Sequence, residues 1–283
     1  MSQSATRRTL DLIRLMADHP SGLTLSDACT ALAIPKSITH RLLAPLADHG
    51  FVRQDAQSGR YGLTLKLTLL GLRHYAGSGI NDVSQPILDR LALATGELAR
   101  LAIVEDEGLV WVAKAQDAPF GLRYDPDTGQ HCVLHATATG KAWLATLPEA
   151  EALRIVAATG FKTPAHFSPN VARSVDQFRD VLRQTRARGY GIAMEEGEPG
   201  TAAVAATVRA SAEALAPAVA TLSVAGPVTR FAPQRQEIFA RELFAAAEEL
   251  SAIWPIRSPL RTQEISGGVA ADAPEREAIQ HVA

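Results

Sequence analysis

Residues 23–61 hold two short helical patterns, a break between them and a hairpin signal, in that order. Thr24 is suited to cap the first helix, with Asp27 three residues later as its partner in a capping box. Pro35 suits the first turn of the second helix, where its missing N–H is not needed. Apolar residues recur at the spacing of one helix face in both patterns, as Leu25, Ala28, Cys29 and Leu32 and then as Ile38, Leu42, Leu43 and Leu46. The stretch therefore predicts a helix, a tight turn and a second helix.

Polar side chains fill the rest of the second helix, and a basic hairpin follows it. Phe51, Val52 and Tyr61 flank a turn that contains Gly59. Lys and Arg pair with phosphates or guanine, and Ser, Thr and His donate to phosphates or base edges. This order is typical of a winged helix-turn-helix DNA-binding module. The candidate DNA-contacting residues are Lys36, Ser37, Thr39, His40 and Arg41 on the helix, and Arg53 and Arg60 on the wing. The open alternative is a dimerisation or docking module whose polar helix face is only solvated.

The distribution of charge agrees with DNA binding at this end of the chain. Residues 1–80 contain nine Lys/Arg and five Asp/Glu, which gives a net charge of +4. Residues 81–255 contain 16 Lys/Arg and 21 Asp/Glu, which gives a net charge of −5. The whole chain carries only −2, so nonspecific polyanion binding by the entire protein is not expected. Phosphate attraction should be confined to the N-terminal part.

The 283 residues suit two domains with substantial cores. We expect the DNA-binding domain at 1–62, a linker helix and hinge at 63–80, an effector-binding domain at 81–255 and a disordered tail at 256–283. The linker is leucine-rich and ends near Gly77, Ser78 and Gly79. Asn81 or Asp82 is the expected cap of the next helix. The linker leucines favour a dimer surface, since one module reads few base pairs; the alternative is packing on their own domain.

The period of the sequence changes after Glu97. Strands are predicted at 98–104, 109–115, 120–124, 190–194, 201–208 and 214–224, and helices at 135–146, 149–159, 175–188 and 234–253. This order predicts an antiparallel α+β domain rather than a doubly wound sheet. The predicted helix at 135 follows a strand-like segment, so its free backbone N–H groups suit a carboxylate or phosphate.

Three motifs add a family resemblance. They are the helix-turn-helix, LHATATGKAWLA at 134–145, and RGYGIAMEEGEPGTAAVAATV at 188–208 followed by LSVAGP at 222–227. Together the chain resembles the IclR-type bacterial transcriptional regulators, which join a winged helix-turn-helix to a GAF-like effector domain. The resemblance implies a DNA-binding regulator controlled by a small organic acid, commonly as a dimer or a dimer of dimers.

The resemblance also implies an effector pocket. It places Ala138, Thr139 and Gly140 at the anion-contacting helix start, Gly121, Tyr124 and Cys132 on the pocket wall, and Thr201 and Ser223 on the strands opposite. Where familiar members carry Asp and Cys, this chain has Ala193 and Ala203. Two polar contacts are therefore absent, which favours a larger or more apolar acid, such as an aromatic acid whose ring packs against Tyr124. The alternative is a degenerate pocket that binds nothing.

Two further departures concern the DNA-binding module. Pro45 lies inside the second helix, where its ring clashes with a preceding carbonyl, so the helix either bends or ends early. Gly62 replaces a more usual basic residue after the wing, which removes one phosphate contact.

Other chemistry finds little support. Two cysteines form neither a disulfide framework nor a four-ligand zinc site, and no cofactor is expected. A metal site at His131, Cys132 and His135 is not favoured, because no further ligand lies nearby in the sequence. Lys141 is expected on a helix surface or at a dimer contact. The pair Glu195 and Glu196 is expected in a solvated turn. No catalytic residues are identified. No apolar run matches a membrane span, so a cytoplasmic protein with no membrane partner is expected.

The sequence thus predicts a transcriptional repressor or activator whose partners are double-stranded DNA with a palindromic operator, a small-molecule effector and a second copy of the chain. The rival interpretation is an enzyme or ligand-binding module on the α+β domain, with the N-terminal unit used only for dimerisation. Arg41→Ala separates them, because only a regulator should lose operator affinity while keeping ligand binding.

Overall fold

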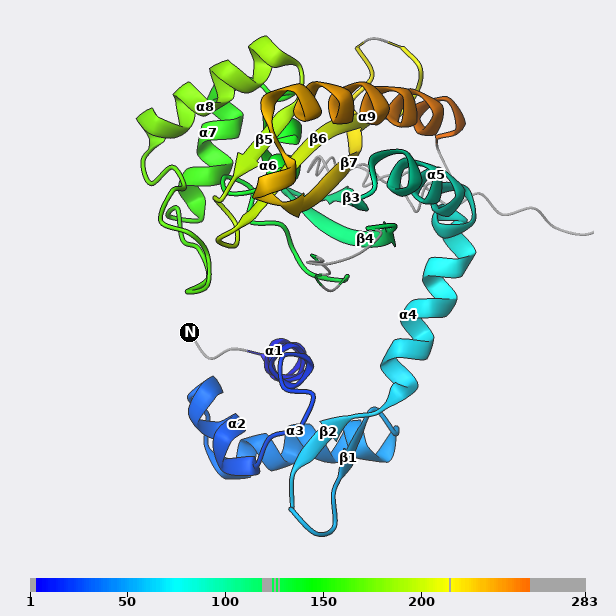
Figure 1. Ribbon diagram of the computed structural model, residues 1–283. Helices are drawn as coiled ribbons and strands as arrows, with labels where there is room; N and C mark the ends of the chain where they lie inside the picture. The colour runs from blue at the N-terminus through cyan, green and yellow to red at the C-terminus, as the bar shows by residue number, and fades with distance from the viewer. Residues whose placement is uncertain (1–3, 119–123, 125, 127, 214, 255–283) are drawn as a thin grey trace, which may run out of the picture.

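The computed structural model describes all residues except 1–3, 119–123, 125, 127, 214 and 255–283 (Figure 1). The N-terminal unit consists of α1 (Ala5–Ala17), α2 (Leu25–Leu32), α3 (Lys36–Asp48), β1 (Val52–Gln54) and β2 (Tyr61–Leu63). The two strands pair antiparallel. Leu12, Met16, Leu43 and Val52 meet in one small core, which holds the three helices against the wing. The predicted helix-turn-helix with a wing is therefore present.

Local chemistry sets the ends of α2 and α3. The Thr24 hydroxyl accepts a hydrogen bond from the Asp27 N–H at 3.1 Å, and the Asp27 carboxylate accepts one from the Thr24 N–H at 3.1 Å. This reciprocal pair is the predicted capping box. Ala33 adopts a left-handed conformation (φ 52°) that ends α2. α3 continues through Pro45 to Asp48, so the helix does not end early at the proline.

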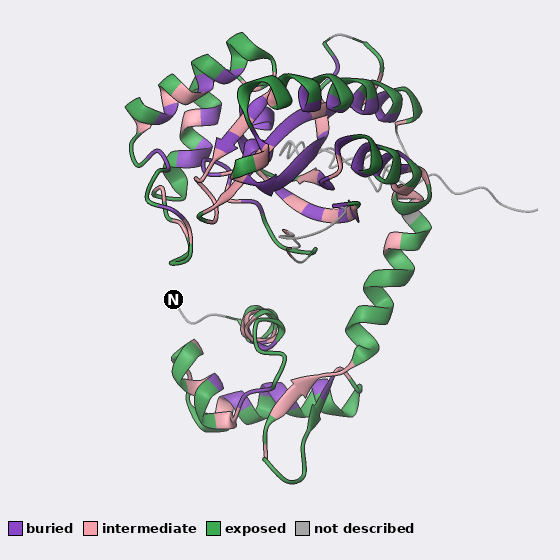
Figure 2. Ribbon diagram, in the orientation of Figure 1, coloured by how far each residue is buried: buried purple, intermediate pink, exposed green. Residues whose placement is uncertain are grey.

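A separate helix joins the two parts of the molecule (Figure 1). α4 (Leu65–Ser78) includes Gly77, and the chain turns only at Gly79, which has φ 72°. α5 (Ile80–Thr95) begins directly after Gly79 without a side-chain cap, so the predicted cap at Asn81 or Asp82 is wrong. The leucines of α4 are 37–73% exposed, and Figure 2 shows the helix green along most of its length. They do not pack on their own domain.

The C-terminal part is built on one five-stranded sheet in the order β4-β3-β7-β6-β5. Its strands are β3 (Leu98–Glu105), β4 (Gly108–Gln116), β5 (Gly191–Met194), β6 (Thr201–Arg209) and β7 (Ala218–Pro227). Every neighbouring pair is antiparallel. The predicted antiparallel α+β class is confirmed. The expected strand at 120–124 falls almost wholly outside the described residues.

Helices cover both faces of this sheet (Figure 1). α5 and α9 (Pro233–Ile253) pack on one face, and α6 (Ala138–Leu144) packs on the other, with α7 (Glu149–Ala158) and α8 (Val175–Arg188) outside it. A strand covered on both sides must be apolar on both sides. β3 meets this condition except at Arg100. Its first five residues are all buried and the other four of them are apolar, as the purple strands in Figure 2 illustrate. Short 3-10 helix η1 (Val228–Arg230) leads from β7 to α9.

Within the described residues, none of the helices is long and apolar enough to cross a membrane.

Candidate functional site

The exposed face of α3 carries most of the predicted DNA contacts. Lys36, Ser37, His40 and Arg41 all have exposed side chains, and Arg53 is exposed on β1. These groups are available to phosphates and base edges without any rearrangement of the core.

Arg60 is exposed at the base of the wing but is partly engaged. Its Nη1 donates to the Gly22 carbonyl at 2.9 Å, which ties the wing to the segment before α2. The Asp55 carboxylate accepts hydrogen bonds from the Ser58 N–H at 2.8 Å and the Ser58 hydroxyl at 2.7 Å, and so closes the wing turn. These bonds lower the pKa of Asp55. The wing is therefore held in one shape by its own side chains.

Thr39 does not belong to the DNA-facing set, so that part of the prediction is wrong. Its side chain is 0% exposed, and its hydroxyl donates to the Pro35 carbonyl at 3.2 Å and accepts from Cys29 Sγ at 3.2 Å. The hydroxyl therefore links α2 to α3 inside the unit. The sequence held the signal, because Thr39 lies three, four and seven residues before the apolar Leu42, Leu43 and Leu46.

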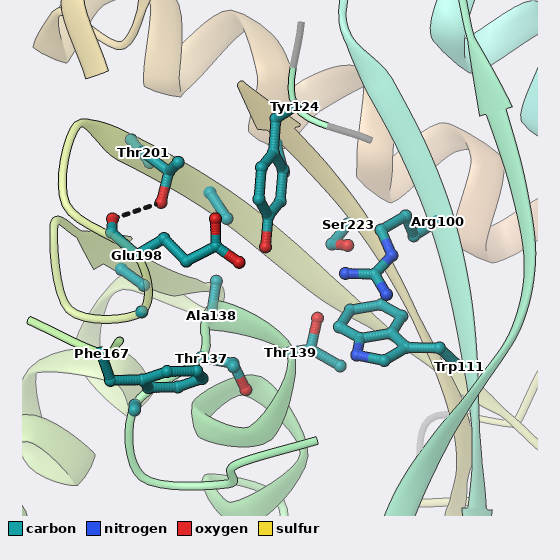
Figure 3. Close-up of a pocket in the computed structure, with 16 residues that line it drawn as sticks. Arg100, Trp111, Tyr124, Thr137, Ala138, Thr139, Phe167, Glu198, Thr201 and Ser223 are labelled. Carbon is teal, nitrogen blue, oxygen red and sulfur yellow. Dashed lines mark hydrogen bonds between the residues drawn. The ribbon is translucent and has the colours of Figure 1, made fainter. Parts of the chain in front are cut away.

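The second candidate site is a cavity between the sheet and the start of α6 (Figure 3). It contains about 510 Å³ of space free of protein atoms, including solvent at its mouth. Of the predicted effector residues, those that line it are Tyr124, Ala138, Thr139, Ala193, Thr201, Ala203 and Ser223. Gly121 lies outside the described residues.

Cys132, predicted on the wall, and Gly140, predicted at the anion-contacting start of the helix, are not among the residues that line the cavity. Cys132 packs with Trp111 and Leu109 in the core beneath it, and burial raises the pKa of its thiol to about 12. Gly140 lies against the chain before α6, where an added Cβ would be 2.2 Å from the Leu134 carbonyl oxygen. The predicted wall position of Cys132 is therefore wrong, because it packs in the core against α6. The Gly140 N–H donates to the Thr137 hydroxyl at 3.1 Å, so it takes part in the helix cap instead of facing a ligand.

The most important cavity residue was missed by sequence reasoning. Arg100 comes from the middle of β3, is only 5% exposed, and lines the cavity. Its guanidinium carbon is 3.4 Å from the centroid of the Trp111 ring, a cation–π stack that fixes its plane. The signal in the sequence is that Arg100 is the single charged residue in the apolar run 98–104, and charged side chains are seldom buried. The other missed wall residues with aromatic or charged groups are Trp111, Phe167 and Glu198.

Hydroxyl groups complete the polar lining. Burial raises the pKa of Tyr124, and the nearby Glu198 carboxylate raises it further while Arg100 opposes. The phenol therefore keeps its proton and can donate. The Thr201 hydroxyl donates to the Glu198 carbonyl at 2.6 Å, so it can only accept from a ligand. The Ser223 hydroxyl, 1% exposed, has no hydrogen-bond partner among the described residues.

The loop that carries Glu198 is tethered to α6 by an ion pair. Lys141, expected on a surface, is instead 2% exposed; its Nζ lies 2.5 Å from a Glu196 carboxylate oxygen and donates to the Ile192 carbonyl at 3.0 Å. Burial lowers the pKa of Lys141, and Glu196 opposes that shift. Glu195 accepts from the Gly200 N–H at 3.0 Å. The two glutamates therefore organise the loop rather than forming a solvated turn.

Two family models together match nearly all of the described chain. One, described as the IclR helix-turn-helix domain, covers residues 5–56, and the other, described as the bacterial transcriptional regulator IclR C-terminal, covers residues 74–252. This chain belongs to the IclR family. It is therefore a transcriptional regulator with a DNA-binding helix-turn-helix and an effector-binding C-terminal domain.

Curated and solved IclR proteins resemble it over almost their whole length. The glycerol operon regulatory protein of Streptomyces griseus is 32% identical over 247 residues, which is 87% of this chain and 92% of that protein. The solved IclR regulator of Alicyclobacillus acidocaldarius superposes with a TM-score of 0.74 at 24% identity, over 89% of this chain and 98% of its own. An IclR homologue of Microbacterium hydrocarbonoxydans was solved in complex with 4-hydroxybenzoate. It superposes with a TM-score of 0.69 at 20% identity, over 88% of this chain and 98% of its own.

Within the IclR fold, the described residues hold no group of three or more His, Cys, Asp or Glu side chains that suits a metal ion. His135 is buried beside Phe161, with ring centroids 5.3 Å apart, and burial lowers its pKa. It packs beneath α6 and contributes to the core.

Proposed function

We propose that this IclR regulator binds a palindromic operator as a dimer in the cytoplasm and that a small aromatic carboxylate, bound in the cavity, controls its affinity for DNA. The observation that carries the effector assignment is Arg100, whose guanidinium is stacked on Trp111 at the cavity wall. The regulators it matches give no reason to assign catalysis, and we propose none.

The lining favours an aromatic acid over a small keto acid. A guanidinium binds a carboxylate through two parallel hydrogen bonds. Trp111, Tyr124 and Phe167 offer flat apolar walls, whereas Ala193 and Ala203 offer no polar contact. A flat ring bearing one carboxylate fits both features. The 4-hydroxybenzoate bound by the Microbacterium homologue supports this class of ligand.

The exposed leucines of α4 and the small size of the DNA-reading unit support the proposed dimer. Five leucines on α4 are exposed: Leu65, Leu67, Leu69, Leu70 and Leu72. Water contact at so many apolar side chains on one helix is unfavourable, and a second copy would cover them. Two α3 helices would then read half-sites about one helical turn apart.

A hydrogen bond joins α4 to β4, the strand that carries Trp111 of the cavity wall. The Tyr75 hydroxyl donates to the Val112 carbonyl of β4 at 3.2 Å, and the neighbouring Trp111 lines the cavity. A ligand that packs on Trp111 therefore favours one placement of α4, and with it one spacing of the paired reading helices.

The DNA half of the proposal is tested by fluorescence anisotropy with the intergenic DNA beside the protein's own gene, over a salt series. Arg41→Ala should lose most operator affinity and flatten the salt dependence by about one phosphate contact, while ligand binding stays intact. A variant of another exposed arginine far from α3, Arg183→Ala, is the matched control. Operator affinity equal to wild type in Arg41→Ala would contradict the assignment.

The effector half is tested by thermal shift with benzoate and glyoxylate as probes. Benzoate should stabilise the wild type, and Arg100→Gln should lose that stabilisation. Stabilisation by glyoxylate but not by benzoate overturns the aromatic assignment, and no response to any acid indicates a cavity without a ligand of this class.

A further inference from the structure

The cavity has a second charged residue besides Arg100, and the sequence motifs gave it no role in binding. Glu198 lines it from the loop between β5 and β6, opposite Arg100. Figure 3 shows the ring of Tyr124 between the Glu198 carboxylate and the Arg100 guanidinium. Both charges act on the Tyr124 hydroxyl: the Glu198 carboxylate raises the pKa of Tyr124, and the Arg100 guanidinium lowers it. A ligand in this space therefore meets a cation at one end and an anion at the other.

The cationic pole is built to receive an anion. Arg100 on β3 lies opposite Ser223 on β7 in the sheet register. The Ser223 hydroxyl is 1% exposed, lines the cavity and has no hydrogen-bond partner among the described residues. A buried hydroxyl without a partner is unfavourable, so a ligand atom that bonds to it is favoured. The Trp111 stack holds the guanidinium plane in place beside it.

The anionic pole is fixed as firmly as a loop residue allows. The Glu198 carbonyl accepts from the Thr201 hydroxyl at 2.6 Å and from the Thr201 N–H at 3.2 Å. Two residues earlier, Glu196 is bound to the buried Lys141. The backbone at Glu198 is therefore anchored from both sides, and its side chain is only partly exposed. An ionised carboxylate accepts hydrogen bonds and cannot donate them.

We propose that the effector carries a carboxylate at one end and a hydrogen-bond donor, a hydroxyl or an amino group, at the other, and that Glu198 is the residue that selects for the donor. This inference rests on the proposed function, since it concerns the same cavity. An acid without a donor covers part of the Glu198 carboxylate and offers it no hydrogen bond in return. A diacid brings two like charges together, which is worse.

The test uses the full chain and isothermal titration calorimetry with three kinds of probe: benzoate, 3- and 4-hydroxybenzoate, and benzene-1,4-dicarboxylate. The wild type should bind the better hydroxybenzoate about tenfold or more tightly than benzoate, as expected for a hydrogen bond to a charged group. The diacid should bind most weakly. In Glu198→Gln the preference for the hydroxyl should fall to within about threefold, because the hydrogen bond loses its charge. The diacid should bind about tenfold more tightly than to wild type, because the amide can donate to it. Glu237→Gln, an exposed residue on α9, is the matched control and should behave as wild type.

A purely structural role for Glu198 would weaken all probes alike, so the gain of diacid binding separates selection from loop stability. Equal affinity of wild type for benzoate and for both hydroxybenzoates overturns the inference while leaving the aromatic-acid proposal intact. An unchanged order of probes in Glu198→Gln also overturns it. Failure of every probe to bind removes the proposed function and the inference together.

Discussion

The buried ion pair between Lys141 and Glu196 gives the sharpest prediction for stability. Lys141→Met keeps the length and apolar stem of the side chain but removes its charge. The substitution leaves two partly buried acceptors, the Glu196 carboxylate and the Ile192 carbonyl, without the donor that now bonds to both. The expected result is destabilisation of the effector domain.

The size of the effect follows from burial. Removing one partner of a buried ion pair costs about 3–5 kcal/mol. Glu196 is 16% exposed and can recover some hydration, so the lower end of about 3 kcal/mol applies. For a domain of this size each kcal/mol shifts Tm by about 2–4 °C, which gives a fall of about 6–12 °C.

Differential scanning calorimetry of the whole protein measures this fall in the effector-domain transition. Arg90→Met is a close control, because Arg90 and Glu249 also approach to 2.5 Å but are 57% and 52% exposed. An exposed pair contributes about 0–1 kcal/mol, so Arg90→Met should shift Tm by less than about 4 °C. Lys141→Met combined with Glu196→Leu should recover much of the loss, since no charge is then stranded. If Lys141→Met costs no more than Arg90→Met, the argument from burial is refuted.

Two further outcomes are expected. Gly140→Ala should destabilise the effector domain by about 1–3 kcal/mol, because the new Cβ would be 2.2 Å from the Leu134 carbonyl oxygen. The control is Gly71→Ala on α4, where a Cβ would meet nothing within 4 Å, so this variant should be neutral or slightly stabilised. Calorimetry measures both, and equal effects of the two substitutions would contradict the prediction. With a thiol reagent at pH 8, Cys29 should react first and Cys132 should stay protected until the protein unfolds. Burial raises the pKa of Cys132 to about 12, so at pH 8 very little of it is the reactive thiolate. Equal labelling rates of the two cysteines in the native protein would contradict this prediction.

The features that the sequence predicted well are those set by neighbours in the chain. The capping box at Thr24 and Asp27 needs only residues three apart, and α8 occupies the predicted 175–188 because its N-cap Ser174 and its terminal Gly189 stand at its ends. The β-strands could be located because alternation and turn residues are also local signals.

The features that were missed depend on residues far apart in the chain. A lysine is usually found on the surface, so the residue type gave no reason to expect Lys141 in the interior. Its ion-pair partner inside the domain is Glu196, which lies 55 residues away in the sequence. Arg100 is placed in the cavity by Trp111 on the next strand, a pairing that the sequence alone does not reveal. Thr39 is the exception, since its spacing already placed it on the apolar face and its residue type argued for the wrong side.

The two poles of the cavity differ in how they are held, and this difference bears on signalling. Arg100, Trp111 and Ser223 sit on three adjacent strands, β3, β4 and β7, so the cationic pole belongs to the rigid sheet. Glu198 sits on a loop whose tether to α6 is the Lys141–Glu196 pair. A ligand bonded at both poles therefore ties the loop to the sheet, whereas one bonded only to Arg100 leaves the loop as it was. The sheet is in turn joined to the linker helix, because the Val112 carbonyl of β4 accepts a hydrogen bond from Tyr75 of α4. Only a ligand that bonds to both Arg100 and Glu198 therefore connects the loop, the sheet and α4.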